Sequence, residues 1–220
     1  MTLALLHTSP VLAPLFHTLC AQHLAGVEIF HMVDESLIKN TIKAGRLEPP
    51  VIRRVARHIE SAHDAGADVV LVTCSSIGPA VTIAQQLFEF PVLRIDEAMA
   101  ENAVRIAKRI GVLATLRTTL EPTLALIRHT AVAGGHTVDV DAQLCEGAFE
   151  AVVRGDTEAH DRMVREGLAA LLQRVDVVVL AQASMVRVLS QLAPEMLTKP
   201  ILSSPELAIL RVKAVMDQRR

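Results

Sequence analysis

The sequence predicts an α/β protein made of two similar halves, each a Rossmann-like or flavodoxin-like parallel sheet. Short apolar runs of strand length alternate with longer stretches of helical period, and this order of elements occurs twice in the 220 residues. Continuous apolar strands are typical of parallel sheets that helices cover on both faces. We therefore expect one doubly covered parallel sheet in each half.

Four apolar runs in the first half have the length of buried strands. They read LALLH, VEIFHMV, DVVLVT and PVLRI, and they begin at Leu3, Val27, Asp68 and Pro91. Residues 49–67, before the third run, repeat apolar side chains with helical period, and arginines occupy the opposite side. The predicted apolar stripe consists of Ile52, Val55, Ala56, Ile59 and Ala62.

The second half repeats this order. Its runs read RIGVLAT, HTVDVDAQL, DVVVLA and KPILSS, and residues 157–175 form the predicted helix before the third run. Cys74 and Gln182 occupy matching positions 108 residues apart, and Thr8 and Thr115 lie 107 apart. Such self-similarity indicates an internal duplication.

We expect the first half to span residues 1–100 and the second to span 101–204. The helix at 205–220 is expected to return to the first half. A pseudo-two-fold axis would relate the halves, with the active site in the cleft between them.

Composition narrows the classes of partner. The net charge is −2 and the chain has no Trp and no Tyr, so it lacks the basic surface and stacking side chains that nucleic-acid binding uses. No apolar stretch is long enough to span a bilayer. We expect a small-molecule ligand, no nucleic acid and no membrane. The hydrophobic content of 51% is also compatible with a homo-oligomer.

The cysteines indicate a reducing compartment. Cys20, Cys74 and Cys145 are odd in number and form no C-x-x-C pair, which argues against a disulfide framework and against a zinc site. We expect a cytoplasmic protein in which Cys20 is a core residue. Cys145 is expected to pack as well, although it could border the cleft.

Hydroxyl-bearing residues follow several predicted strands, in HTSP, VTCSS, LATLRTT and LAQAS. Ligands of open parallel sheets bind at the carboxyl ends of strands, and free helix amides there bind anions. The sequence therefore predicts a carboxylate site; the alternative is that these residues only cap helices. The residues concerned are Thr8, Ser9, Ser75, Ser76, Thr115, Thr118 and Ser184.

Cys74 is the candidate reactive group. A thiol at a helix N-terminus tends to have a lowered pKa, and its thiolate can transfer a proton or attack an electrophile. The alternative is a packed, inert thiol.

Other polar residues give weaker indications of a functional role. His31, Asp34 and Glu35 match no metal motif and are expected to be solvated or to cap a helix. We expect the pair His160–Asp161 on the surface. Arg94 is expected either to bind a substrate carboxylate or to lie on the surface.

The motifs LLHTSP, VDESL, LVTCSSIGPA, IGVLATLRTT and VVVLAQASM together resemble the aspartate/glutamate/hydantoin racemase superfamily, which also contains arylmalonate decarboxylase and maleate isomerase. The resemblance implies a cofactor-independent enzyme without a metal, acting on a small carboxylate or hydantoin-like substrate. It places Cys74 at the first thiol position. Thr8, Ser9, Ser75, Ser76, Thr115 and Thr118 would hold the carboxylate.

At the second thiol position the family pattern is broken, because Gln182 stands there, followed by Ala183 and Ser184. An amide cannot exchange a proton with carbon, whereas racemisation normally needs two acid/base groups. Three interpretations stay open. The chain is a racemase or isomerase in which another residue near the cleft, for example His7 or Cys145, is the second base. The alternatives are a single-cysteine decarboxylase and a non-catalytic protein that binds small acids.

Overall fold

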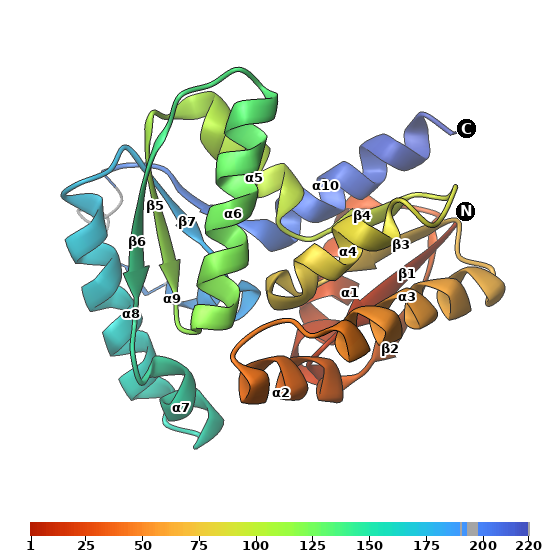
Figure 1. Ribbon diagram of the computed structural model, residues 1–220, viewed down its shortest axis with the longest axis horizontal. Coiled ribbons are helices and arrows are strands. Elements are labelled where there is room, and N and C mark those ends of the chain that lie inside the picture. Colours follow the sequence, from red (N-terminus) through yellow and green to blue (C-terminus); the bar gives the residue numbers. More distant parts are fainter. Residues whose placement is uncertain (190, 193–197, 220) are drawn as a thin grey trace. The chain divides into compact units, whose positions relative to one another are not determined.

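The computed structural model describes residues 1–189, 191–192 and 198–219, which divide into two compact units (Figure 1). The first unit comprises Met1–Ala98 and Pro205–Arg220, and the second comprises Met99–Ser204. Each unit contains a four-stranded sheet in which all pairs are parallel. The predicted α/β fold with two parallel-sheet halves is therefore confirmed.

The first sheet has the strand order β2-β1-β3-β4. Its strands are β1 (Thr2–His7), β2 (Glu28–Val33), β3 (Val69–Val72) and β4 (Val92–Arg94). The central strands β1 and β3 are almost entirely buried, because helices cover both of their faces. Parallel pairing brings the carboxyl ends of all four strands to one edge of the sheet.

Helices cover this sheet on both faces. They are α1 (Ala13–His23), α2 (Glu35–Ala44), α3 (Pro49–Asp64), α4 (Gly78–Ala84) and α10 (Ser204–Asp217). The 3-10 turns η1 (Pro10–Leu12) and η2 (Ser75–Ile77) precede α1 and α4. Gly45 ends α2 at φ +68, a left-handed conformation that favours glycine.

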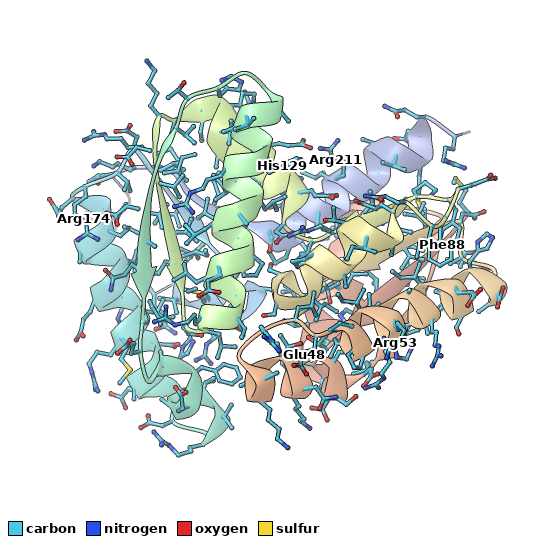
Figure 2. The ribbon with its side chains drawn as sticks, in the orientation of Figure 1. Glu48, Arg53, Phe88, His129, Arg174 and Arg211 are labelled. Atoms are coloured by element: carbon cyan, nitrogen blue, oxygen red, sulfur yellow. The ribbon has the colours of Figure 1, made fainter. Side chains whose placement is uncertain are left out.

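The helix predicted at 49–67 is present as α3 and ends a turn earlier. Its apolar stripe packs into the core of the first unit, where Val55 and Ile59 are fully buried. Arg53 lies exposed on the opposite side (Figure 2). The helical period therefore identified the buried face.

The second sheet repeats the topology with the order β6-β5-β7-β8. Its strands are β5 (Arg109–Ala114), β6 (Asp139–Leu144), β7 (Val177–Leu180) and β8 (Ile201–Ser203). The other elements are α5 (Glu97–Ile106), α6 (Arg117–Ala133), α7 (Ala148–Val153), α8 (Thr157–Leu172), η3 (Ala183–Met185) and α9 (Val186–Leu189). The helix predicted at 157–175 is α8.

Both expectations for Arg94 are wrong. The side chain is buried and forms a two-bond ion pair with Asp96, with Nε and Nη2 each 3.0 Å from a carboxylate oxygen. Its Nη1 donates to the Thr82 hydroxyl at 2.9 Å, and a Cβ on Gly78 would lie only 2.4 Å from Nη2. The pair therefore lies directly behind the first turn of α4, where only glycine leaves enough room.

The expectation of a surface pair at His160–Asp161 is also wrong. Both residues are buried in α8, and His160 Nδ1 lies 2.7 Å from Asp161 Oδ1. Arg187 on α9 donates to the same carboxylate oxygen at 2.6 Å. These bonds compensate for the burial of the charge and hold α9 against α8.

In the part of the chain that the structure describes, no helix is both long enough and apolar enough to cross a membrane.

Asp96→Ala is expected to lower the free energy of unfolding by about 3–5 kcal/mol, because it leaves the Arg94 charge buried and unpaired. Urea unfolding measures this change. The exposed residue Asp64 at the end of α3 provides the control, and Asp64→Ala should change stability by less than about 0.5 kcal/mol. Equal effects of the two substitutions would contradict the structural role of the ion pair.

Candidate active site

In the first unit, the predicted site residues lie at the carboxyl ends of β1 and β3. The two strands pair with Leu6 opposite Val72, and the Thr73 amide donates to the Leu6 carbonyl at 3.0 Å. The chain segments that follow, with Thr8 and Cys74, therefore leave the sheet side by side. Both segments enter short 3-10 turns instead of continuing as strand.

Cys74 occupies the N-cap position of η2 with an extended backbone and is half-buried. Burial raises the pKa of its thiol above the ordinary value. Hydrogen bonds from the Thr8 and Ser76 side chains and from the Ser76 and Ile77 amides counteract this shift only in part. The expected lowering of the pKa is therefore wrong. A single 3-10 turn supplies little dipole, and loss of solvent outweighs it.

The hydroxyl groups around the thiol differ in exposure. Thr8, Ser75 and Ser76 are buried, whereas Ser9 is half-buried. Ser9 is the N-cap residue of η1, yet its side chain makes no capping hydrogen bond. Thr8 and Ser76 both bond the sulfur, so neither serves only as a helix cap.

A chain of hydrogen bonds runs through His7, the last residue of β1. Its Nδ1 lies 2.8 Å from the Thr73 hydroxyl, which itself donates to the Leu6 carbonyl at 3.2 Å. With the Thr73 proton directed to the Leu6 carbonyl, Nδ1 of His7 donates to the Thr73 hydroxyl and Nε2 accepts. His31 Nδ1, 2.8 Å from His7 Nε2, is then the donor of the next bond.

Burial, together with the neighbouring charge of His31, lowers the pKa of His7 to about 4. Burial and His17 also lower the pKa of His31. At neutral pH, His7 is thus a neutral ring that holds Thr73, the residue before Cys74. Thr73 was not among the residues predicted from the sequence. Its position directly after Val72, at the carboxyl end of β3, is the feature that could have identified it.

Asp34 has the capping role expected for it. Its carboxylate accepts from the Ser36 amide at 3.0 Å at the start of α2, and from His58 Nε2 at 2.8 Å. Arg54 donates to the same carboxylate. Burial tends to raise the pKa of Asp34, but bonds from Ser36, His58 and Arg54 hold it below its usual value. Within the described ranges, no cluster of three or more metal-ligating side chains occurs.

Cys20 and Cys145 are packed thiols, as expected. They are 2% and 6% exposed, and burial is the main cause that raises the pKa of each to about 11. The three cysteines are free. Cys74 is the most accessible of them.

In the second unit, Gln182 stands two residues beyond the end of β7, as Cys74 stands two beyond β3. Its Oε1 accepts from the Thr115 amide at 2.6 Å and from the Thr115 hydroxyl at 3.0 Å. The Thr118 hydroxyl oxygen is buried without a hydrogen-bond partner among the described residues. Ala183 is half-buried and Ser184 is exposed.

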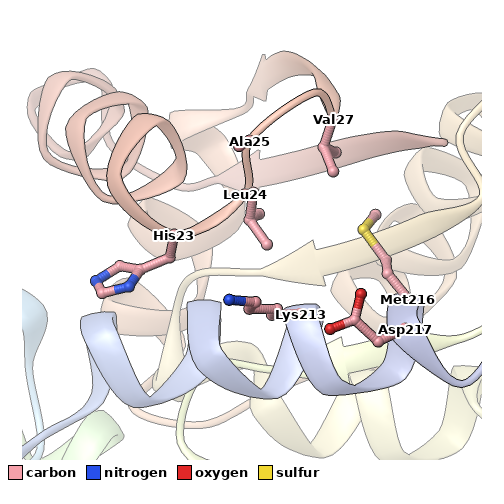
Figure 3. Close-up of a pocket in the computed structure, with 7 residues that line it drawn as sticks. All are labelled: His23, Leu24, Ala25, Val27, Lys213, Met216 and Asp217. Atoms are coloured by element: carbon pink, nitrogen blue, oxygen red, sulfur yellow. The ribbon is translucent and has the colours of Figure 1, made fainter.

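A separate cavity of about 210 Å³ lies in the first unit between the C-terminal end of α1 and helix α10 (Figure 3). Its lining includes the side chains of His23, Lys213 and Met216. None of the site residues predicted from the sequence lines this cavity, as far as the described chain extends.

Comparison with known proteins identifies one family whose sequence model matches this chain. The sequence model described as Asp/Glu/Hydantoin racemase matches residues 8–212. No curated protein matches the chain in sequence.

Solved structures with the same fold include racemases for several substrates. Glutamate racemase from Francisella tularensis in complex with D-glutamate has a TM-score of 0.75 and 14% identity, with 99% of this chain and 81% of that chain covered. Allantoin racemase from Klebsiella pneumoniae has a TM-score of 0.67 and 20% identity, with 100% of this chain and 89% of that chain covered. Picrophilus torridus aspartate racemase has a TM-score of 0.70 and 13% identity, with 97% of this chain and 94% of that chain covered. At these identities the likeness concerns the fold.

Iodoacetamide is expected to alkylate Cys74 before Cys20 and Cys145, at a rate that continues to rise above pH 9, because the raised pKa keeps the thiol protonated at neutral pH. Thr8→Val removes one hydrogen bond to the sulfur and should slow the reaction near neutral pH by roughly threefold to tenfold. Mass spectrometry of timed reactions measures both effects. A rate that levels off at neutral pH would contradict the raised pKa.

The pKa of His7 predicts a loss of stability in acid. It lies near 4 in the folded protein against 6.5 for an ordinary histidine, so the unfolded chain binds more protons below pH 6.5. Between pH 6.5 and pH 4 this residue should remove about 2.5 kcal/mol from the free energy of unfolding. Urea unfolding at several pH values tests this. His7→Phe keeps a ring but cannot titrate, and it should lose correspondingly less stability in acid.

Proposed function

Because the chain belongs to the Asp/Glu/hydantoin racemase family, we propose that it is a cofactor-independent enzyme of the racemase/isomerase type. It acts by thiol acid/base chemistry at a carbon next to a carboxylate or carbonyl group. The substrate is a small carboxylate or a hydantoin-like compound. The observation that carries the proposal is a half-buried thiol at a strand end, bonded by two hydroxyl groups and two amides.

The proton-transferring group in this proposal is Cys74. As a thiolate it takes the proton from the substrate carbon, and as a thiol it returns one. Bonds from Thr8 and Ser76 stabilise the negative sulfur that forms when the proton leaves. The raised pKa means that the ligand-free enzyme carries the proton on sulfur. Delivery of a proton to a carbanion can start from this state, whereas abstraction of a substrate proton requires that the thiol first release its own proton to water.

The carboxylate site of the proposal uses the hydroxyl groups at the strand ends. In the first unit these belong to Ser9, before η1, and Ser75, the first residue of η2, since the Thr8 hydroxyl donates its one proton to the sulfur. Hydroxyl and amide donors stabilise the negative charge that develops on the substrate oxygens as the carbon loses its proton. Thr115, Thr118 and Ser184 are the corresponding candidates in the second unit.

A single-cysteine decarboxylase is the second candidate, and Gln182 favours it. Its amide cannot exchange a proton, so one thiol is the evident acid/base group. In this reaction the bond between the α-carbon and one carboxylate breaks and carbon dioxide leaves. The electron pair stays on the substrate as an enediolate, Cys74 protonates the carbon, and the thiolate recovers a proton from water.

The three free cysteines suit a reducing cytoplasm, where Cys74 would stay a thiol, and we propose that location for the enzyme. The structural neighbours suggest the first compounds to try, since they are glutamate, aspartate and allantoin racemases. Substituted malonates extend the set to decarboxylation.

Proton NMR in deuterated water with glutamate, aspartate, allantoin, hydantoins and substituted malonates tests the proposed chemistry. Deuterium is expected at the α-carbon of one compound, and Cys74→Ala should reduce its rate of entry at least about a hundredfold, the typical effect of losing an acid/base group. Circular dichroism and urea unfolding check that the variant still folds.

The position of the deuterium separates the two reactions. Deuterium in both enantiomers of recovered substrate indicates racemisation, whereas deuterium only in a product that lacks one carboxylate, in one configuration, indicates decarboxylation. A folded and fully active Cys74→Ala protein would overturn the thiol mechanism. Binding of a compound without any exchange would indicate a non-catalytic protein for small acids.

A further inference from the structure

We infer that Gln182 contacts the substrate and donates hydrogen bonds from its side-chain amide to a carboxylate or carbonyl oxygen. The inference rests on the proposed function only in that the ligand is a small acid. It assigns Gln182 the role of a binding and specificity residue in place of proton transfer.

The orientation of the Gln182 amide is set by Thr115. Both the backbone N–H and the hydroxyl of Thr115 point to one atom of the amide, at 2.6 Å and 3.0 Å. A backbone N–H can only donate, so this atom must be the oxygen and not the nitrogen. The amide group is planar, and its NH2 therefore faces away from Thr115.

The NH2 group is available to a ligand. No described residue accepts a hydrogen bond from Nε2 of Gln182, and the side chain is only half-buried, so a small molecule can reach it. Two N–H donors on a rigid planar group match the oxygens of a carboxylate, or a carbonyl oxygen, better than they match an ammonium group.

The first unit contains the same hydrogen bond with sulfur as the acceptor. There the Thr8 hydroxyl bonds Cys74, and in the second unit the Thr115 hydroxyl bonds Gln182. Cys74 and Gln182 also share an extended backbone, at φ −136 and φ −127. The amide oxygen thus takes the acceptor role of the sulfur, and the NH2 is an added donor that a cysteine does not have.

Thr118 gives a second, independent indication of a ligand. Its hydroxyl oxygen is buried and has no partner among the described residues, although it lies in the first turn of α6, close after Thr115 in the chain. A buried hydroxyl without a partner costs about 1–3 kcal/mol. A substrate oxygen bound near Gln182 would supply the missing partner.

Gln182→Glu is the sharpest test, because it keeps an oxygen for Thr115 and replaces only the NH2 by a second oxygen. Malonate is the probe, titrated at about pH 8, well above the ordinary carboxyl pKa. We expect Gln182→Glu to bind malonate at least about tenfold more weakly, because the substitution removes the N–H donors and introduces a negative charge that repels malonate. Gln173→Glu makes the same charge change at an exposed position of the same unit and should bind as the wild type does.

The side-chain amide signals of 15N-labelled full-length protein report the contact directly. The signals missing from the Gln182→Glu spectrum identify Gln182, and we expect them to shift on addition of malonate in the wild type and in Cys74→Ala. Signals that stay in place throughout the titration, or equal malonate affinity of wild type and Gln182→Glu, would overturn the inference.

Failure of this inference and failure of the proposed function can be told apart. A malonate-dependent shift of the Gln182 amide without deuterium exchange in any compound would support the binding role and overturn the enzymatic one. Exchange that depends on Cys74, with the same KM in Gln182→Glu as in the wild type, would overturn the binding role and support the enzyme.

Discussion

The parallel pairing of the first and third strands in each unit is the constraint on which the site depends. In the first unit β1 runs parallel to β3, and in the second β5 runs parallel to β7. The carboxyl ends of the two strands of each pair therefore lie next to each other at one edge of their own sheet. The residues that leave these strands are therefore close neighbours although they are more than 60 positions apart in the chain, as Thr115 and Gln182 are. The sheet brings polar groups together without needing any local sequence motif.

The two units place different side chains in one hydrogen-bond pattern. In both units a threonine hydroxyl bonds the residue that follows the third strand. Sulfur at that position gives a group that can carry a proton, whereas an amide gives a neutral group with two donors. The two positions therefore differ in the chemistry of one side chain, while the backbone is extended in both.

Burial decides the charge of the groups around the thiol. It keeps His7 neutral, with a pKa of about 4, and it raises the pKa of the Cys74 thiol. The charged pair Arg94–Asp96 is also buried, directly behind Gly78, and the two residues compensate each other. The groups that bond the Cys74 thiol are thus neutral donors, which can stabilise a negative charge on sulfur.

The sequence by itself determined the strands, the helices α3 and α8 and the position of Cys74 after a strand, because apolar runs and helical period are local properties. Tertiary structure decided the rest. Burial of Arg94 and of His160–Asp161, the bond from His7 to Thr73 and the orientation of Gln182 depend on partners in other elements. The raised pKa of Cys74 has the same origin, since desolvation sums over all atoms that surround a group and no stretch of sequence contains that sum.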